Sequence, residues 1–339
     1  MKESGIPPNR LSKSPLLLGI LAVGFVVAIY SNTFSIPWKL DDLPNIVTNS
    51  RLHLTAMDPA SLGQTFSASP NGGSELYRPI ACLSFALNWY FDADHVFGYH
   101  AVNLAVHLAT AFFLYLTLLK LHASPALAGR FEKRSVYSIA LLAAVFWAAN
   151  PAQTQAVNYI VQRMATLAAL FSILSIYFYV SGRLSATEYR SGACYLACAA
   201  GFVLALGSKE NAAILPLSLA LTEIVFFQAA KSSQKKHIII GVTFMAAAGV
   251  IVVAYFFYDL NPLFFLKGYN GRPFSLSERL LTESRILVFY LSQLFYPHPA
   301  RLSMVHDFEI SRSLLEPWTT SAAILLIVAL IGLSLKRMR

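Results

Sequence analysis

Two adjacent carboxylates, Asp41 and Asp42, follow the first long apolar run of the chain, within the segment Trp38–Ile46. A carboxyl group in a partly apolar site holds its proton more readily than one in water, so it can act as a general base toward a hydroxyl group. The alternative is that the pair is solvated or caps a following helix. The residue types therefore indicate either proton transfer or local structure.

Several positive side chains stand next to apolar runs, where they could bind a phosphate or an anionic headgroup through charge-assisted hydrogen bonds. Arg163 ends an amide-rich turn and opens an apolar run, and snorkelling to lipid is its alternative role. Lys209 is adjacent to Glu210, and a mutual ion pair is the alternative there. Arg285 and Arg301 bracket a short apolar segment. These five residues are candidate ligands or orienting groups for phosphate.

A third polar set is His100, Asn103 and His107, whose spacing of three and then four residues places them on one face of a helix. Polar groups within a membrane span face the bundle or a water-filled cavity. Hydrogen bonding between helices is the plainer interpretation, because a metal site would need further ligands that the sequence does not offer. No metal site is predicted, and Gln162 joins this set as a supporting polar residue.

The elements that must position these side chains are membrane helices. Hydrophobic residues make up 56% of the chain and charged residues 13%, and the mean hydropathy is +0.55. The apolar residues gather in runs close to the roughly 20 residues that cross a bilayer. We expect eight spans, near residues 15–34, 99–121, 135–150, 163–181, 191–208, 211–229, 237–257 and 318–335.

The charges give this arrangement a direction. With both termini in the cytoplasm, the cytoplasmic segments hold fifteen Lys and Arg against four Asp and Glu, and the opposite side holds eleven against thirteen. The net charge of +9 is then explained by topology and anionic lipid, which argues against a nucleic-acid partner. The large loops, about 35–98 and 258–317, lie outside, where Pro79–Phe91 and Ile286–Tyr296 are too short to span and are expected to be interfacial helices. The prediction is an all-α polytopic bundle forming one membrane domain over residues 1–339.

The order of these motifs resembles that of the C-type membrane glycosyltransferases. The acid pair is followed by Arg-Pro-Ile at 78–80 and Tyr-His-Ala-Val-Asn-Leu at 99–104 with His107 beyond it. Val-Asn-Tyr-Ile-Val-Gln-Arg at 157–163, Ser-Lys-Glu-Asn at 208–211 and Tyr-Pro-His-Pro-Ala-Arg-Leu at 296–302 complete the series. Within that class the chain is most similar to bacterial relatives of the transmembrane and tetratricopeptide-repeat O-mannosyltransferases, over residues 30–315.

The resemblance implies an inverting transferase with a polyprenyl-phosphate sugar as donor and a Ser or Thr hydroxyl of an exported protein as acceptor. It places the reaction on the periplasmic face of a bacterial inner membrane, among membrane lipids and without a cofactor, with a divalent cation left open. Asp41 or Asp42 matches the acid that activates the acceptor. The positions that match donor-site groups are Arg78, Arg163, Lys209, Glu210, Arg285 and Arg301.

Two departures from the resembled pattern keep other functions open. Asn150-Pro151 stands where those proteins commonly have His-Pro, and no repeat domain follows within these 339 residues. Both leave room for a catalytically silent subunit that acts with a partner protein in a larger membrane complex. A lipid or solute transporter is the third alternative, disfavoured because the polar residues gather on one side and not at mid-membrane.

Overall fold

The computed structural model describes residues 14–227, 249, 269, 271–303 and 306–337. Within these ranges the secondary structure is entirely helical, as expected for an all-α membrane protein. The contacts divide the chain into two compact units, one of residues 1–149 and 156–215, the other of residues 150–155 and 216–339. Each unit is described by itself.

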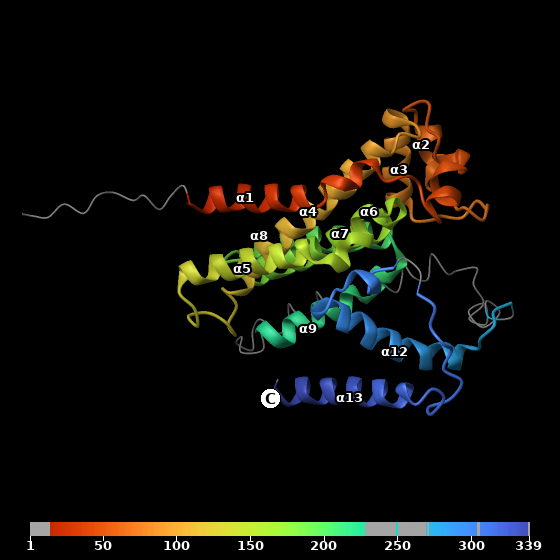
Figure 1. Ribbon diagram of the computed structural model, residues 1–339. Helices are drawn as coiled ribbons and strands as arrows, with labels where there is room; N and C mark the ends of the chain where they lie inside the picture. The colour runs from red at the N-terminus through yellow and green to blue at the C-terminus, as the bar shows by residue number, and fades with distance from the viewer. Residues whose placement is uncertain (1–13, 228–248, 250–268, 270, 304–305, 338–339) are drawn as a thin grey trace, which may run out of the picture. The chain divides into compact units, whose positions relative to one another are not determined.

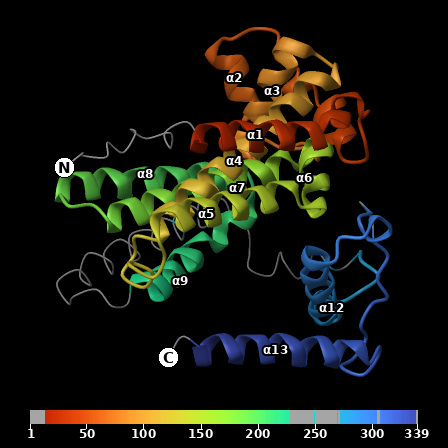
Figure 2. The ribbon, with the colours of Figure 1, turned by 60° about the vertical axis from the view of Figure 1, so that its left-hand side comes forward.

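The first unit is built around four long helices, α4 (Val96–Leu121), α5 (Lys133–Ala149), α7 (Arg163–Arg183) and α8 (Glu188–Leu206). In Figures 1 and 2 these helices run side by side, with α4 packed on α5 and α7, and α7 packed on α8. Helix α1 (Ser14–Ile29) packs against α4 and α5. At 26 residues, α4 is about 39 Å long, enough to cross the roughly 30 Å of membrane hydrocarbon.

Short helices form the large loop between α1 and α4 at one end of this bundle (Figure 1). Asp58 caps α2 by accepting the backbone N–H groups of Ala60 and Ser61. Helix α3 matches the expected interfacial segment and, at 14 residues, is too short to span. These elements are η1 (Ser31–Ser35), η2 (Leu43–Val47), η3 (Ser50–Leu52), α2 (Pro59–Thr65) and α3 (Pro79–Asp92).

The connection from α5 to α7 is a series of short helices, η4 (Pro151–Gln153), α6 (Thr154–Asn158) and η5 (Ile160–Gln162). Gln162 is half-buried, and no hydrogen bond reaches its side chain from the described parts of the chain. After α8 the chain turns through η6 (Glu210–Ile214) into α9 (Leu215–Phe227). At this turn Gly207 packs closely on α3, because a Cβ atom added to Gly207 would lie 2.8 Å from Cγ1 of Ile80.

The second unit contains α12 (Leu276–Phe295), η7 (Pro299–Arg301) and α13 (Thr319–Arg337), with α12 packed on α13. Helix α12 starts ten residues before the expected segment Ile286–Tyr296. A capping box explains the earlier start: the Ser275 side chain accepts from the Glu278 backbone and the Glu278 side chain accepts from that of Ser275. The Asn150 side chain, in the same unit, donates to the backbone oxygen of Leu294.

Six described helices are long and apolar enough to cross a membrane, and seven if α5 and its bent continuation Pro151–Asn158 form one span. They correspond to seven of the eight expected runs. The remaining run, 237–257, lies outside the described residues. The six helical segments are Leu16–Ser35, Val96–Leu121, Ile160–Arg183, Glu188–Leu206, Glu210–Phe227 and Thr319–Arg337.

The orientation can be tested with Ser74 and Ala128, two exposed residues in the loops at opposite ends of α4. We replace each by Cys in a chain whose Cys82, Cys194 and Cys198 are changed to Ala. In intact cells a membrane-impermeant maleimide should label Ser74→Cys and spare Ala128→Cys, because the distribution of basic residues predicts that the second loop is cytoplasmic. Both should react after solubilisation, and the reverse pattern in cells would overturn the orientation.

Candidate functional site

The acid pair lies in a tight turn whose two carboxylates have different surroundings. Asp42 is 1% exposed. Its oxygens accept the backbone N–H groups of Lys39 at 2.9 Å and Val161 at 2.7 Å. Asp41 is exposed, and its own backbone N–H donates to the Tyr159 hydroxyl at 2.8 Å. Asp42 therefore fixes the turn to the segment before α7, and Asp41 presents its carboxylate outward.

The backbone of this turn is strained immediately before Asp41. Leu40 has a φ of 41°, in the left-handed region that side chains other than Gly rarely adopt. Arg78, at the start of α3, has a φ of 42°. Residues in such conformations cluster at functional sites, because only surrounding contacts can hold them there. Arg78 is thus a predicted site residue with a strained backbone, and Leu40 immediately precedes the predicted acid pair. A third such residue, Ala93 with a φ of 49°, lies at the end of α3.

Arg78 forms a two-pronged ion pair with Glu210. Its Nε lies 2.9 Å from Oε1 and its Nη2 lies 2.9 Å from Oε2, while Nη1 contacts the Met164 sulfur at 3.1 Å. The Ile80 backbone N–H donates to the Gly207 carbonyl at 2.9 Å, which ties the start of α3 to the end of α8. The structure therefore brings Arg78, Lys209 and Glu210 together, although they are about 130 residues apart in the chain.

Lys209 is the cation of this group that keeps an available charge. Its side chain is half-buried, and no ion pair or hydrogen bond to its ammonium group occurs within the described ranges. Burial, followed by the nearby Arg78 cation, lowers the pKa of Lys209, with the Glu210 charge opposing the shift. An ammonium group in this setting gains more from an arriving anion than one in water does.

Tyr77 lies near both the exposed acid and the Arg78–Glu210 ion pair. Burial raises the pKa of its phenol, and the charges of Arg78, Glu210 and Asp41 all act on it as well. A single side chain is thus within electrostatic range of both the exposed acid and the ion pair. Neither Tyr77 nor Tyr159 is predicted as a site residue from the sequence, because an aromatic ring beside a basic residue or in an amide-rich turn is not a specific signal.

Arg163 is placed differently from the expectation that it reaches a phosphate. Its side chain is fully buried. Its guanidinium donates to Asn103 Oδ1 at 2.7 Å and Asn88 Oδ1 at 2.5 Å, and to the backbone oxygens of Ser84 at 3.1 Å and Tyr99 at 2.8 Å. Four of the five N–H groups are therefore used to join α7 to α3 and α4, and the guanidinium is enclosed between these helices.

The charge of Arg163 has no carboxylate in direct contact within the described residues. Asn88 supplies an indirect one, because its amide nitrogen donates to Asp92 Oδ2 at 3.1 Å while its oxygen accepts from Arg163. The rings of Phe85 and Tyr99 lie 4.8 and 5.4 Å from the guanidinium carbon. The buried cation is thus surrounded by dipoles and ring faces, which lower the cost of its burial.

The three polar residues of α4 that the sequence singled out, His100, Asn103 and His107, are all buried on one face of the helix. His100 contacts the Thr33 hydroxyl at 3.2 Å and the Ile36 carbonyl at 2.9 Å. His107 Nε2 donates to the Ala148 carbonyl at 2.9 Å. Together with the hydrogen bond between Arg163 and Asn103, these contacts join α4 to three neighbouring segments. Within the described residues, no group of three or more His, Cys, Asp or Glu could hold a metal ion.

Arg285 and Arg301 belong to the second unit, where each holds the chain that follows α12. Arg285 donates to the Glu309 carbonyl at 2.8 Å and the Ser311 hydroxyl at 3.3 Å. Arg301 hydrogen-bonds the Ser292 hydroxyl and lies over the Phe289 ring, 4.8 Å from its centre. Both are half-buried and partly engaged, so their role at a donor site stays a prediction.

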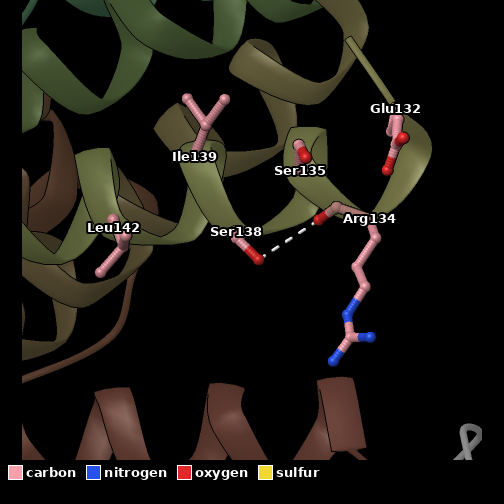
Figure 3. Close-up of a pocket in the computed structure, with 6 residues that line it drawn as sticks. All are labelled: Glu132, Arg134, Ser135, Ser138, Ile139 and Leu142. Atoms are coloured by element: carbon pink, nitrogen blue, oxygen red, sulfur yellow. Dashed lines mark hydrogen bonds between the residues drawn. The ribbon is translucent and has the colours of Figure 1, made fainter.

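A hollow of about 430 Å³ lies elsewhere in the first unit, along the start of α5. Figure 3 shows its lining, in which the Ser138 hydroxyl donates to the Arg134 backbone oxygen. None of the predicted site residues is part of it. The lining residues are Glu132, Arg134, Ser135, Ser138, Ile139 and Leu142.

Comparison with known proteins supports the coarser part of the resemblance, a likeness to protein O-mannosyl-transferases. The chain is 26% identical over 294 residues to a protein O-mannosyl-transferase, tmtc2, of Xenopus laevis, an alignment covering 83% of this chain and 33% of that protein. The chain is similar to protein O-mannosyl-transferases. It is 32% identical over 163 residues to the mouse protein O-mannosyl-transferase TMTC2, covering 45% of this chain and 17% of that protein.

A third relative, the human protein O-mannosyl-transferase TMTC3, is 26% identical over 166 residues, which cover 48% of this chain and 17% of the relative. The chain therefore spans a third or less of the length of these relatives. No model of a protein family matches the chain. No solved structure matches it.

Removing the buried cation should destabilise the first unit. In Arg163→Met the volume is nearly kept, but four oxygen acceptors lose their donor, which should cost about 3–5 kcal/mol of unfolding free energy. The measurement is the thermal midpoint in detergent, with the exposed Arg134→Met as control. Should Arg163→Met fail to accumulate, Asn88→Leu provides a milder change; a wild-type midpoint in either variant would contradict the role of the network.

The buried carboxyl of Asp42 should make stability depend on pH. Burial is the largest effect and raises the pKa of Asp42 from 3.8 to about 6, against the opposing hydrogen bonds from Lys39 and Val161. Between these values the native protein keeps a proton that the unfolded chain releases, so the unfolding free energy falls as pH rises through that window.

The expected fall is on the order of 3 kcal/mol, and it should be absent from Asp42→Asn. Thermal midpoints of both proteins across the window measure it. Parallel pH curves for the two proteins would show that Asp42 does not titrate in this way.

Proposed function

We propose that this chain is a membrane glycosyltransferase that moves a sugar from a polyprenyl-phosphate donor to a hydroxyl group of an exported protein. Two independent lines support the proposal. The relatives that align with it are named protein O-mannosyl-transferases, and the Xenopus alignment covers 83% of the chain. The first unit also carries the exposed carboxylate of Asp41 and the two cations Arg78 and Lys209, whose chemistry suits that transfer.

The observation that carries the proposal is the division of labour in the acid pair. A general base must reach the acceptor hydroxyl, and of the two acids only the exposed Asp41 is accessible. Asp42 has both oxygens engaged by backbone N–H groups. We assign proton abstraction to Asp41 and placement of the turn to Asp42.

The reaction is a single displacement at the anomeric carbon. The acceptor oxygen forms a bond to that carbon as the bond from carbon to the donor phosphate oxygen breaks, and the acceptor proton passes to the Asp41 carboxylate. The polyprenyl phosphate leaves with the bonding electrons and gains negative charge. Attack from the face opposite the leaving group inverts the configuration, and nearby cations stabilise the developing charge.

We assign binding of the donor phosphate to Lys209 together with Arg78. Lys209 has an available ammonium group, and Glu210 holds the Arg78 guanidinium by two parallel hydrogen bonds. Glu210 is thus an orienting residue. Because Arg163 is enclosed by α3 and α4, we place it in the scaffold that supports the site and not on the donor.

We further propose that the transfer takes place on the extracytoplasmic face of a bacterial inner membrane, with both termini in the cytoplasm. The support is the distribution of Lys and Arg, which favours one side of the membrane. The long loop that carries Asp41 and Arg78 is then outside. Mannose is the sugar to test first, because it is the one in the names of the relatives.

Asn replacements separate the roles of the two acids. Asp41→Asn keeps size and loses basicity, so the transfer rate should fall by about 10²–10⁴ with donor binding retained. Asp42→Asn should act mainly through stability. Rates are measured with radiolabelled polyprenyl-phosphate mannose and a Ser- and Thr-rich peptide. A normal rate in Asp41→Asn would refute the base assignment; a folded wild type without transfer would favour the silent-subunit alternative.

Donor affinity tests the cation. Lys209→Ala should weaken binding of polyprenyl-phosphate mannose by about 1.5–3 kcal/mol, because a charge-assisted contact to the phosphate is lost. The matched control is Lys120→Ala, a half-buried lysine at the far end of α4 from the acid turn. Equal affinity in the two variants, at normal expression, would remove Lys209 from the donor site.

A further inference from the structure

The hydroxyl of Tyr159 touches the exposed acid of the turn. It accepts the backbone N–H of Asp41 at 2.8 Å, and the side-chain carboxylate of the same residue is near enough to act on the pKa of the phenol. A phenol offers two acceptor lone pairs and one O–H proton. With the N–H of Asp41 on a lone pair, the phenol proton is available to the carboxylate, so one hydroxyl has the capacity to bind both the main chain and the side chain of a single residue.

The ring that carries this hydroxyl is held firmly. Tyr159 is only 4% exposed. On either side of it, the Val157 and Ile160 carbonyls accept from the Asn103 amide at 3.4 and 3.3 Å. Its position is therefore set by α4, independently of the acid turn that it contacts.

The chemistry of the phenol fits a donor and not a second base. Burial raises the pKa of Tyr159 to about 12, with the carboxylates of Asp41 and Asp42 contributing. The hydroxyl consequently keeps its proton at neutral pH, where carboxylates are ionised.

We infer that Tyr159 is a positioning residue that directs the Asp41 carboxylate toward the acceptor hydroxyl. One carboxylate oxygen takes the hydrogen bond from Tyr159, and the other is left to receive the acceptor proton during transfer. The inference rests on the proposed function, since it assigns Tyr159 a part in that reaction. It also explains why a buried aromatic hydroxyl reaches across 118 residues of sequence to an exposed turn.

The test uses a matched pair of tyrosines. Tyr159→Phe deletes one oxygen atom at the acid turn. Tyr30→Phe deletes the same atom from an equally buried ring, 4% exposed, whose hydroxyl donates to the Ala148 carbonyl at 3.2 Å. We expect Tyr159→Phe to lower kcat about 10- to 100-fold with KM for polyprenyl-phosphate mannose unchanged, because a misdirected base slows the chemical step. Tyr30→Phe should stay within about twofold of wild type.

A double-mutant cycle distinguishes positioning from a general structural effect. In an Asp41→Asn background, followed by long incubations with radiolabelled donor, adding Tyr159→Phe should reduce the residual rate by less than about twofold. If Tyr159→Phe instead lowers the rate equally in both backgrounds, or leaves wild-type kcat unchanged, the inference is wrong while the proposed function stands.

A second measurement does not depend on transfer. Backbone hydrogen exchange of the peptide over residues 39–43 should quicken in Tyr159→Phe and not in Tyr30→Phe, because the Asp41 N–H loses its acceptor. Unchanged exchange in Tyr159→Phe would overturn the inference directly. If folded wild type transfers no sugar, the proposed function is wrong, whatever the exchange shows. If exchange of this peptide is unaltered in Tyr159→Phe, the role of the Tyr159–Asp41 contact is wrong, whatever the transfer rate is.

Discussion

The buried guanidinium of Arg163 is the interaction on which the rest of the first unit depends. It stands at the first position of α7 and donates hydrogen bonds to two oxygens of α3 and two of α4. A cation removed from water is costly unless all its donors are satisfied, so these acceptors are required in this arrangement. The relative placement of three helices is thereby determined by one side chain.

The placement of the acid turn and of the ion pair follows from that junction. Asn103 accepts from Arg163 and also holds the carbonyls of Val157 and Ile160, which positions the segment whose Val161 N–H binds Asp42. On the other side, the Arg163 contacts hold α3, whose first residues carry Arg78 toward Glu210. Each half of the candidate site is thus supported by the same buried charge, although neither half touches it through its own charged groups.

The sequence predicts the large features of this protein because they are set by composition over long windows. The apolar runs locate the spans, and the i, i+3, i+7 spacing of the α4 polar residues gives their common buried face. Local detail is also readable where its signal is short-range: the Ser275–Glu278 capping box marks the true start of α12, which the apolar run alone misplaces.

What the sequence does not show is which polar group is covered by a distant segment. Asp41 and Asp42 are identical in type and adjacent, and only the approach of Val161, 119 residues away, distinguishes them. Arg163 looks like a residue at a membrane surface until Asn88 and Asn103 are seen around it.

The left-handed backbone at Leu40 and Arg78 has a further consequence, which concerns engineering. At Leu40, glycine would relieve about 1–2 kcal/mol of strain but would also raise the conformational entropy of the unfolded chain, so the net gain in folding free energy would be small and the backbone beside Asp41 would be less constrained. At Arg78, the same substitution would also remove the guanidinium that pairs with Glu210.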